Sequence, residues 1–354
     1  MGQVVLVTGV AGELGRRYGS QLSRDASVER VIGVDVVPPR GDLGDVNFVR
    51  ADIRNPVIAK VIVRERVDTV VHASVLATPG AGGGRVSMKE LNVIGTMQLL
   101  AACQQAPDLR RVVVKSSSTV YGASNRDPAM FTEGMGAKRQ PTGGFAKDVA
   151  EVESYVRGFA RRRPDVAVTM LRMADVIGPE IASSMTGYFR MPVIPTVLGF
   201  NPRMQFVHEQ DAIDVLIHAT TSAATGTFNV AGEGIITLSQ AVRRLGRPTL
   251  PLPAFALASV GSAIRQTRVA DFSPEQVGFL TFGRGLDTTR MRDVLGYLPR
   301  FTTAEAFGDF AAAVSPGLIN ADRVRATEHA LVGALSRRSS TPVSTSARGG
   351  ELGG

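Results

Sequence analysis

The chain has 354 residues, of which 44% are hydrophobic and 20% are charged, so it can bury the core of one large domain or of two smaller ones. Its formal net charge is +8, but basic residues form only one run of three, Arg161–Arg163, and there is no tryptophan. This distribution argues against a nucleic-acid-binding protein. The single cysteine, Cys103, excludes an intrachain disulfide; with no secretory signal at the N-terminus, we expect a cytoplasmic protein.

The first predicted element is a strand over Val4–Val7, an apolar run of the kind that is buried on both faces of a parallel sheet. Gly9, Gly12 and Gly15 follow, and then a helix; a second apolar run ends on Asp35, about 20 residues after the last glycine. Such glycines let backbone amides approach a pyrophosphate at a helix N-terminus. The pattern predicts a dinucleotide-binding βαβ unit, and the alternative is a merely tight turn between strand and helix.

Strands and helices continue to alternate up to about residue 172. The expected strands are 47–50, 69–71, 111–115 and 166–172, and the expected helices are 56–65, 88–105 and 145–161. A glycine-rich loop is expected over 78–84. This alternation predicts an α/β protein with a Rossmann-type doubly wound parallel sheet, whose ligand lies at the carboxyl ends of the strands.

The regular alternation fails after Ala174. We therefore expect residues 1–174 to form the dinucleotide-binding domain, with strands near 205–208 and 227–230 returning to its sheet (205–232). Residues 175–316 should form a smaller, discontinuous C-terminal substrate lobe. Residues 317–354 should form one helix, to about Arg338, and a disordered tail with few hydrophobic residues to bury.

Several short motifs occur in a fixed order along the chain. They are Thr8–Gly15, Asp35, Asp52-Ile53, His72-Ala73-Ser74, Asn92, Ser116–Gly122, Lys147, Leu171-Arg172 to Gly178-Pro179, Phe228–Val230, and Asp287 to Tyr297. Together they resemble the extended short-chain dehydrogenase/reductase family, the NAD-dependent epimerase/dehydratases that include UDP-glucose 4-epimerase. The resemblance covers about residues 3–315.

The resemblance implies a bound nicotinamide dinucleotide. Its implied contacts are Gly9, Gly12, Glu13, Leu14, Gly15, Asp35, Asp52, Ile53, His72, Ala73, Ser74, Asn92 and Lys147. Asp35 would bind the adenosine ribose and repel a 2′-phosphate, which favours NAD over NADP. Arg16 and Arg40 leave NADP open as the alternative.

Catalysis in this family needs a tyrosine four residues before the lysine that corresponds to Lys147, and this position is Gly143. Glycine has no proton to transfer, and general acid–base help is worth about 10²–10⁴ in rate. By resemblance Ser117 would bind the reacting oxygen and Lys147 the nicotinamide ribose. Tyr121, Thr142 or a water could replace the missing tyrosine.

The substrate residues implied by the resemblance are Ser117, Ser118, Tyr121, Asp175 and Arg203. Asp175 stands where sugar-nucleotide enzymes have asparagine, and Met204 stands where an arginine is expected. A carboxylate gained and a guanidinium displaced both disfavour a diphosphate. The histidines and the lone cysteine show no metal-ligand spacing, so no metal site is expected.

Two functions remain open on this sequence. The first is an NAD-dependent epimerase, dehydratase or dehydrogenase with an atypical proton carrier, acting on a nucleotide sugar or related hydroxyl compound. The second is a catalytically disabled dinucleotide-binding regulator or scaffold. By resemblance, a homodimer would form through helices 88–105 and 145–161. The apolar residues of segment 255–264, with Arg265 and Arg268, fit either a core-packing helix or, less favoured, one lying on a membrane surface with an apolar or lipid-linked ligand.

Overall fold

The structure, a computed structural model, describes residues 2–75, 85–138, 141, 143–256 and 273–314. The expected loop 78–84, the C-terminal helix and tail after residue 316, and most of segment 255–264 lie outside these residues. Thr142, one of the possible substitutes for the missing tyrosine, lies outside them as well.

A seven-stranded parallel sheet forms the centre of the larger lobe, in the strand order β11-β6-β5-β4-β1-β2-β3. Its strands are β1 (Gln3–Thr8), β2 (Val28–Asp35), β3 (Val46–Arg50), β4 (Thr69–His72), β5 (Arg111–Ser117), β6 (Ala167–Met173) and β11 (Gly226–Val230). The order turns back at β1, between β4 and β2, so ligands are expected at the carboxyl ends of these strands. The Rossmann-type α/β fold predicted from the alternating pattern is confirmed.

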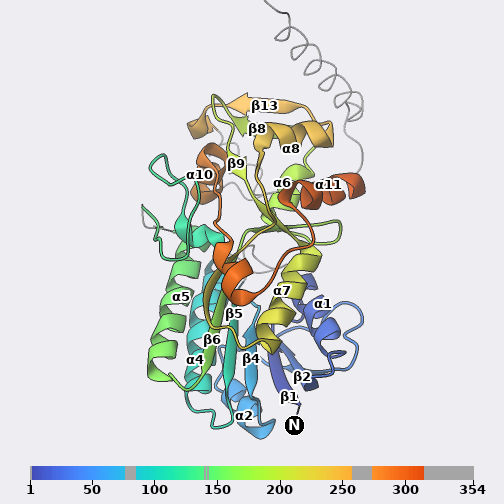
Figure 1. The fold of residues 1–354 in the computed structure, drawn as a ribbon, viewed down its shortest axis with the longest axis vertical. Helices are drawn as coiled ribbons and strands as arrows, with labels where there is room; N and C mark the ends of the chain where they lie inside the picture. Colours follow the sequence, from blue (N-terminus) through green and yellow to red (C-terminus); the bar gives the residue numbers. More distant parts are fainter. Residues whose placement is uncertain (1, 76–84, 139–140, 142, 257–272, 315–354) are drawn as a thin grey trace, which may run out of the picture.

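Helices cover both faces of this sheet (Figure 1). Helices α2 (Val57–Arg64), α4 (Thr96–Gln104) and α5 (Gly144–Arg162) pack on one face. Helices α1 (Glu13–Leu22) and α7 (Glu209–Thr221) pack on the other. The two apolar cores between helices and sheet explain why the strands read as continuous hydrophobic runs in the sequence.

The single helix expected over 88–105 is observed as three successive segments. They are α3 (Arg85–Lys89), the π-helix η1 (Glu90–Gly95) and α4. The Thr96 hydroxyl donates to the Asn92 backbone oxygen within this turn. A Cβ atom on Gly95 would lie 2.8 Å from Ile53 Cδ1, so the wide turn packs directly against the loop after β3. Single π-turns of this kind are often found at functional sites.

The second lobe lies above the carboxyl ends of the sheet (Figure 1). It contains three two-stranded sheets: β7 (Asp175–Ile177) with β10 (Phe206–His208), β9 (Arg203–Met204) with β12 (Ile236–Thr237), and β8 (Ile194–Val197) with β13 (Thr249–Leu252). Around them lie α6 (Ser184–Phe189), α8 (Leu238–Leu245), α10 (Pro274–Phe282) and α11 (Thr303–Ala313). The π-helix η3 (Met291–Leu295) packs on the main lobe instead, where Met291 and Leu295 join the core beside α1 and α7. Of the two strands expected to return to the main sheet, β11 does so, whereas β10 pairs with β7 instead.

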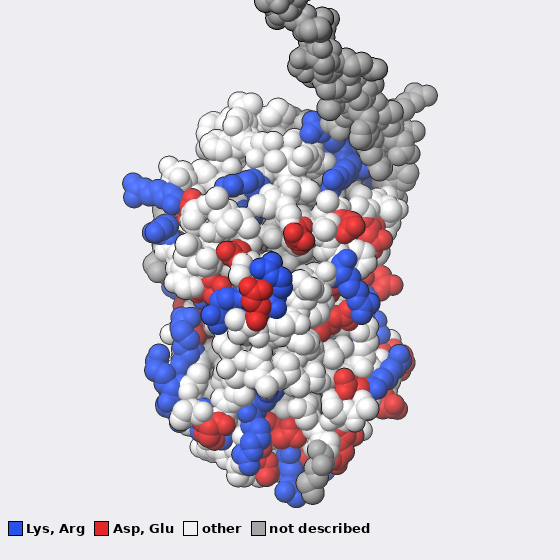
Figure 2. All heavy atoms as spheres, viewed as in Figure 1, with Lys and Arg blue, Asp and Glu red and all other residues white. Residues whose placement is uncertain are grey.

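Charged side chains of both signs are interspersed on the face shown in Figure 2. Among the described helices, none combines the length and the apolar character needed to cross a bilayer. Phe255, the first residue of the apolar segment 255–264, has 77% of its surface exposed.

Candidate dinucleotide cleft and active site

The glycines in the turn between β1 and α1 have two different roles. Two of them are required by the packing of the turn, and the third leaves open space. Gly9 has φ +84°, and a Cβ there would lie 2.8 Å from Ser74 Cα; a Cβ on Gly15 would overlap the Gly9 carbonyl oxygen. These two glycines are required by the packing of the turn itself. A Cβ on Gly12 would meet only Gly9 O, at 3.5 Å, so this position is open on the protein side. Gly12 also begins α1 with no side-chain cap, which leaves the helix N-terminus available to an anion.

A cleft of about 60 Å³ opens beside this turn. Its lining residues are Thr8, Gly9, Gly12, Val34, Asp35, Val36, Ala51, Ile53, Ser74 and Leu91. The Asp35 carboxylate accepts hydrogen bonds from the amides of Ala11 (3.0 Å) and Val36 (2.7 Å), which fix its position at the end of β2. The structure therefore brings together five of the residues expected at the cofactor: Gly9, Gly12, Asp35, Ile53 and Ser74. A dinucleotide fits this arrangement, because it offers amides for phosphates and a carboxylate for ribose hydroxyls.

Other expected cofactor residues stand at or near the cleft edge. Asp52 forms a two-pronged ion pair with Arg54 (2.7 Å), which holds the pKa of its carboxyl below the usual value. Glu13 binds Arg16, and Arg16 also donates to the Asp42 carbonyl oxygen (2.9 Å). Arg16 is thus already engaged on the loop after β2, whereas Arg40 is exposed.

His72 lies beneath the cleft. The Thr96 hydroxyl gives its proton to Asn92 O, so it accepts from His72 Nε2 (2.8 Å), and His72 Nδ1 accepts from the Thr8 hydroxyl (2.9 Å). Complete burial lowers the pKa of this ring to about 3, so the imidazole is neutral. Its contacts join β1, β4 and α4, so His72 supports the floor of the cleft. Asn92 is buried on η1 and donates to Asp148 Oδ2 on α5, at 3.4 Å.

Ser117 ends β5 at the mouth of the sheet. Its hydroxyl oxygen accepts from the Thr119 amide (3.2 Å) and from the Thr119 hydroxyl (3.1 Å). These two contacts fix the oxygen and leave the Ser117 proton to be donated. The arrangement suits a group that binds the reacting oxygen of a substrate.

Tyr121 is built into the core. Its hydroxyl donates to Asn229 Oδ1 (2.7 Å) and accepts from Arg172 Nη1 (2.9 Å), and its ring stacks on Phe131. Burial raises the pKa of the phenol, so it remains protonated. These contacts favour a structural role for Tyr121 over the substitute proton carrier considered from the sequence.

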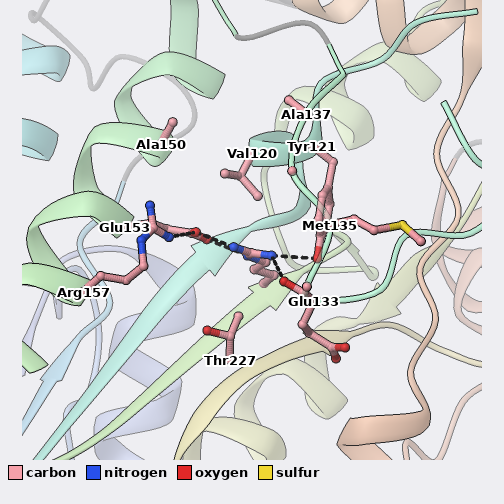
Figure 3. Close-up of a pocket in the computed structure, with 12 residues that line it drawn as sticks. Val120, Tyr121, Glu133, Met135, Ala137, Ala150, Glu153, Arg157 and Thr227 are labelled. Carbon is pink, nitrogen blue, oxygen red and sulfur yellow. Dashed lines mark hydrogen bonds and ion pairs between the residues drawn. The ribbon is translucent and has the colours of Figure 1, made fainter. Parts of the chain in front are cut away.

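The Tyr121 network forms the floor of a second cavity of about 370 Å³ (Figure 3). Arg172 donates to the Tyr121 hydroxyl and to Glu153, and Figure 3 shows Arg157 also reaching Glu153 from α5. This cavity lies at the β6–β11 edge of the sheet and shares no lining residue with the dinucleotide cleft.

Lys147 is not among the residues that line the cleft beside the glycine turn. Its side chain is 44% exposed and lies 3.9 Å from Glu151, one turn further along α5. Val149, two residues on, is fully buried in the core, and a two-residue step is about 200° around a helix. Lys147 therefore lies on the side of α5 away from the sheet. The side that packs on the sheet is apolar, with Phe145, Val149 and Val152.

A carboxylate from the second lobe lies at Gly143. Glu275, in the first turn of α10, has its Oε1 3.8 Å from where a Cβ on Gly143 would be. Its Oε2 is buried and has no hydrogen-bond partner in the described part of the chain. Gly144, with φ +64°, is the neighbour that leaves room for this carboxylate. Glu275 is 132 residues from Gly143 in the chain, and the sequence analysis did not single it out.

The expected substrate residues are partly separated. Arg203 is exposed, and Met204 is buried in the core of the second lobe. Asp175 begins β7 at the mouth of the sheet, half-buried. A guanidinium that the sequence did not single out, Arg284, lies there instead: it donates to Ser118 Oγ and to the Gly122 carbonyl oxygen, both at 3.0 Å.

Within the residues that the structure places, no group of three or more His, Cys, Asp or Glu side chains could hold a metal ion. The glycine turn, the open N-terminus of α1 and the carboxylate at the end of β2 together define a Rossmann-type dinucleotide-binding architecture.

The chain belongs to the NAD dependent epimerase/dehydratase family, whose family model matches residues 5–231. An uncharacterized protein of Mycobacterium tuberculosis is 46% identical over 341 residues, covering 95% of this chain and 90% of that protein. A trifunctional UDP-glucose 4,6-dehydratase/UDP-4-keto-6-deoxy-D-glucose 3,5-epimerase/UDP-4-keto-L-rhamnose-reductase of Arabidopsis thaliana is 25% identical over 187 residues, covering 50% of this chain and 28% of the plant protein.

Solved structures of nucleotide-sugar enzymes share the fold, and two examples follow. The UDP-glucose 4-epimerase of Thermotoga maritima with UDP-glucose superposes with a TM-score of 0.67 at 17% identity, covering 88% of this chain and 98% of that one. MoeE5 in complex with UDP-glucuronic acid and NAD also gives a TM-score of 0.67, at 23% identity, covering 87% and 98%.

Proposed function

We propose that this protein binds NAD in the cleft beside the glycine turn and acts on a nucleotide sugar by transient hydride transfer, as an epimerase or dehydratase. The observation that carries the proposal is the open cradle at Gly12, where an uncapped helix N-terminus lies next to the fixed carboxylate of Asp35. Membership of the family and the ligands of its structural neighbours support the same cofactor and substrate class. The Asp35 carboxylate favours NAD over NADP.

When bound, the dinucleotide supplies a hydride acceptor. The chain's own residues then orient the substrate hydroxyl and take its proton. Ser117 donates its free proton in a hydrogen bond to the reacting oxygen. Glu275 is our candidate for the proton acceptor. Its carboxylate lies beside Gly143, the position from which the side chain of the family's tyrosine would extend, and its Oε2 has no hydrogen-bond partner among the described residues.

The alternative is a dinucleotide-binding regulator or scaffold without catalysis. The position of Lys147 favours it, since the ammonium lies on the outer side of α5 and the inner side is apolar. In that case, NAD binding would be retained and no nucleotide sugar would be converted.

The discriminating experiment incubates the protein with NAD and UDP-glucose, UDP-galactose or UDP-glucuronate, and separates the products by chromatography. The enzyme proposal predicts NAD-dependent conversion of at least one sugar. It also predicts that Glu275→Gln lowers the rate about 10²-fold or more, because the amide cannot take a proton. NAD binding without any conversion supports the regulator instead. Activity gained only in Gly143→Tyr would mean that the wild-type site is intact but lacks its proton carrier.

We further propose that the protein works in the cytoplasm as a homodimer through the outer faces of α4 and α5. Tyr155, an exposed residue of α5, would be covered there. Analytical ultracentrifugation should give twice the monomer mass, and Tyr155→Glu should shift the protein to monomer. A wild-type monomer at micromolar concentration would contradict the dimer.

A further inference from the structure

Arg284 is a buried cation at the mouth of the sheet. It follows α10 in the second lobe (Figure 1), and only 8% of its surface is exposed. Its guanidinium reaches across to the main lobe, where it donates from Nη1 to Ser118 Oγ and from Nε to the Gly122 carbonyl oxygen. It also lies over the Phe279 ring, with Cζ 5.1 Å from the centroid.

All of these partners are neutral. In the described part of the chain, no carboxylate lies within ion-pair distance of Arg284, although the charges of Asp175 and Asp127 act on it from further away. Arg172 shows how a buried arginine is usually paired with a carboxylate. It is buried to a similar degree, and it is paired on two nitrogens with Glu153, at 2.8 and 2.7 Å.

A buried charge without a counter-ion is costly, so buried charges are normally paired or bind a ligand. A guanidinium carries five N–H donors in a planar fork that matches a carboxylate. Two of the Arg284 nitrogens make the hydrogen bonds described, so donors remain for an anion. Among the described residues, Arg284 therefore has donors and a charge without an ion-pair partner, which are available to an anionic group of the substrate.

The position of Arg284 indicates which part of the substrate carries the anionic group. Ser118 is the residue next to Ser117, which binds the reacting oxygen in the proposed function, so the anion must lie close to the reacting sugar ring. Asp175, at the start of β7 on the same mouth, would repel a diphosphate but can accept hydrogen bonds from sugar hydroxyls.

We propose that Arg284 binds a carboxylate carried on the sugar ring, so that the preferred substrates are nucleotide sugars of the uronic acid class. This inference rests on the proposed function and specifies its substrate. The positive charge of Arg284 would then determine specificity, whereas its contacts to Ser118 and Gly122 hold it in position.

The test compares three ligands that differ in one group: UDP-glucuronate, UDP-glucose and UDP, each titrated calorimetrically into the NAD-loaded protein. The wild type should bind UDP-glucuronate about tenfold or more tightly than UDP-glucose. Arg284→Met should abolish this preference and leave the affinity for UDP-glucose and UDP nearly unchanged, whereas Arg284→Lys should keep part of it.

Arg290→Met is the matched control, because Arg290 also lies over a phenylalanine, Phe228, but is exposed and away from Ser118. It should leave the preference intact. Equal wild-type affinity for UDP-glucuronate and UDP-glucose would overturn the inference alone, as would an equal loss for all three ligands in a folded Arg284→Lys protein. A wild type that binds NAD but none of the three would overturn the proposed function together with the inference.

Discussion

Asp35 carries both a structural and a recognition role, and the two can be separated. Its carboxylate holds the amides of Ala11 and Val36, and it faces the cleft. Asp35→Asn keeps one oxygen acceptor but removes the charge. We expect NAD to bind about tenfold more weakly and NADP to bind no worse, because the repulsion of a 2′-phosphate is gone. Titration with both dinucleotides measures the ratio of affinities, and an unchanged ratio would contradict the role given to Asp35.

His72 should make the fold sensitive to acid. Its pKa is lowered to about 3 in the folded protein, against about 6.5 when unfolded, so the unfolded state binds more protons between these values. Stability should therefore rise with pH across this window and fall as the pH drops through it. We expect the free energy of unfolding to fall by about 2 kcal/mol more in the wild type than in His72→Gln between pH 7 and pH 5.

Urea titrations at both pH values measure this difference. The same dependence in His72→Gln as in the wild type would show that His72 is not the group responsible.

Two glycines of the turn between β1 and α1 should respond differently to substitution by alanine. Gly15→Ala should destabilise the protein by about 1–3 kcal/mol even without ligand, because its Cβ overlaps the Gly9 oxygen. Gly12→Ala should cost about 1 kcal/mol or less, since only Gly9 O lies within 4 Å of the new methyl group. Its effect should appear in NAD affinity, which we expect to fall about tenfold because the methyl group would hold the phosphates away from the amides.

Thermal melts with and without NAD separate the two variants. The expected pattern is a lowered melting temperature for Gly15→Ala and a reduced NAD-induced rise for Gly12→Ala. A Gly12→Ala protein that NAD stabilises as much as the wild type would exclude a pyrophosphate at this position.

Helix α5 shows why part of the site was out of reach of the sequence. The sequence gives the four-residue spacing between Gly143 and Lys147, but it does not show whether these positions face the sheet or solvent. The orientation of α5 depends on which of its residues pack on the sheet, and here these residues include Val149 and Val152. Asp35 was easier to predict, because the end of a buried strand fixes its position within one residue.

At the scale of the whole molecule, the alternation of apolar runs and helices was enough to predict the parallel sheet, whose carboxyl-end edge is where we expect the ligand. The second lobe was not predictable in the same way, since its short strands carry little periodicity and β10 pairs with β7 rather than with the main sheet. Arg284 and Glu275 reach the site from that lobe, and Arg284 is 166 residues from its partner Ser118. Contacts over such distances follow only from the folded arrangement of both lobes.

The proposed function depends on a nicotinamide dinucleotide bound at the N-terminus of α1, and calorimetric titration of the purified protein with NAD tests this most directly. We predict one site per chain, an affinity weakened about tenfold in Asp35→Asn and in Gly12→Ala, and weaker binding of NADP. No heat of binding and no rise in melting temperature with either dinucleotide at millimolar concentration would contradict the central claim.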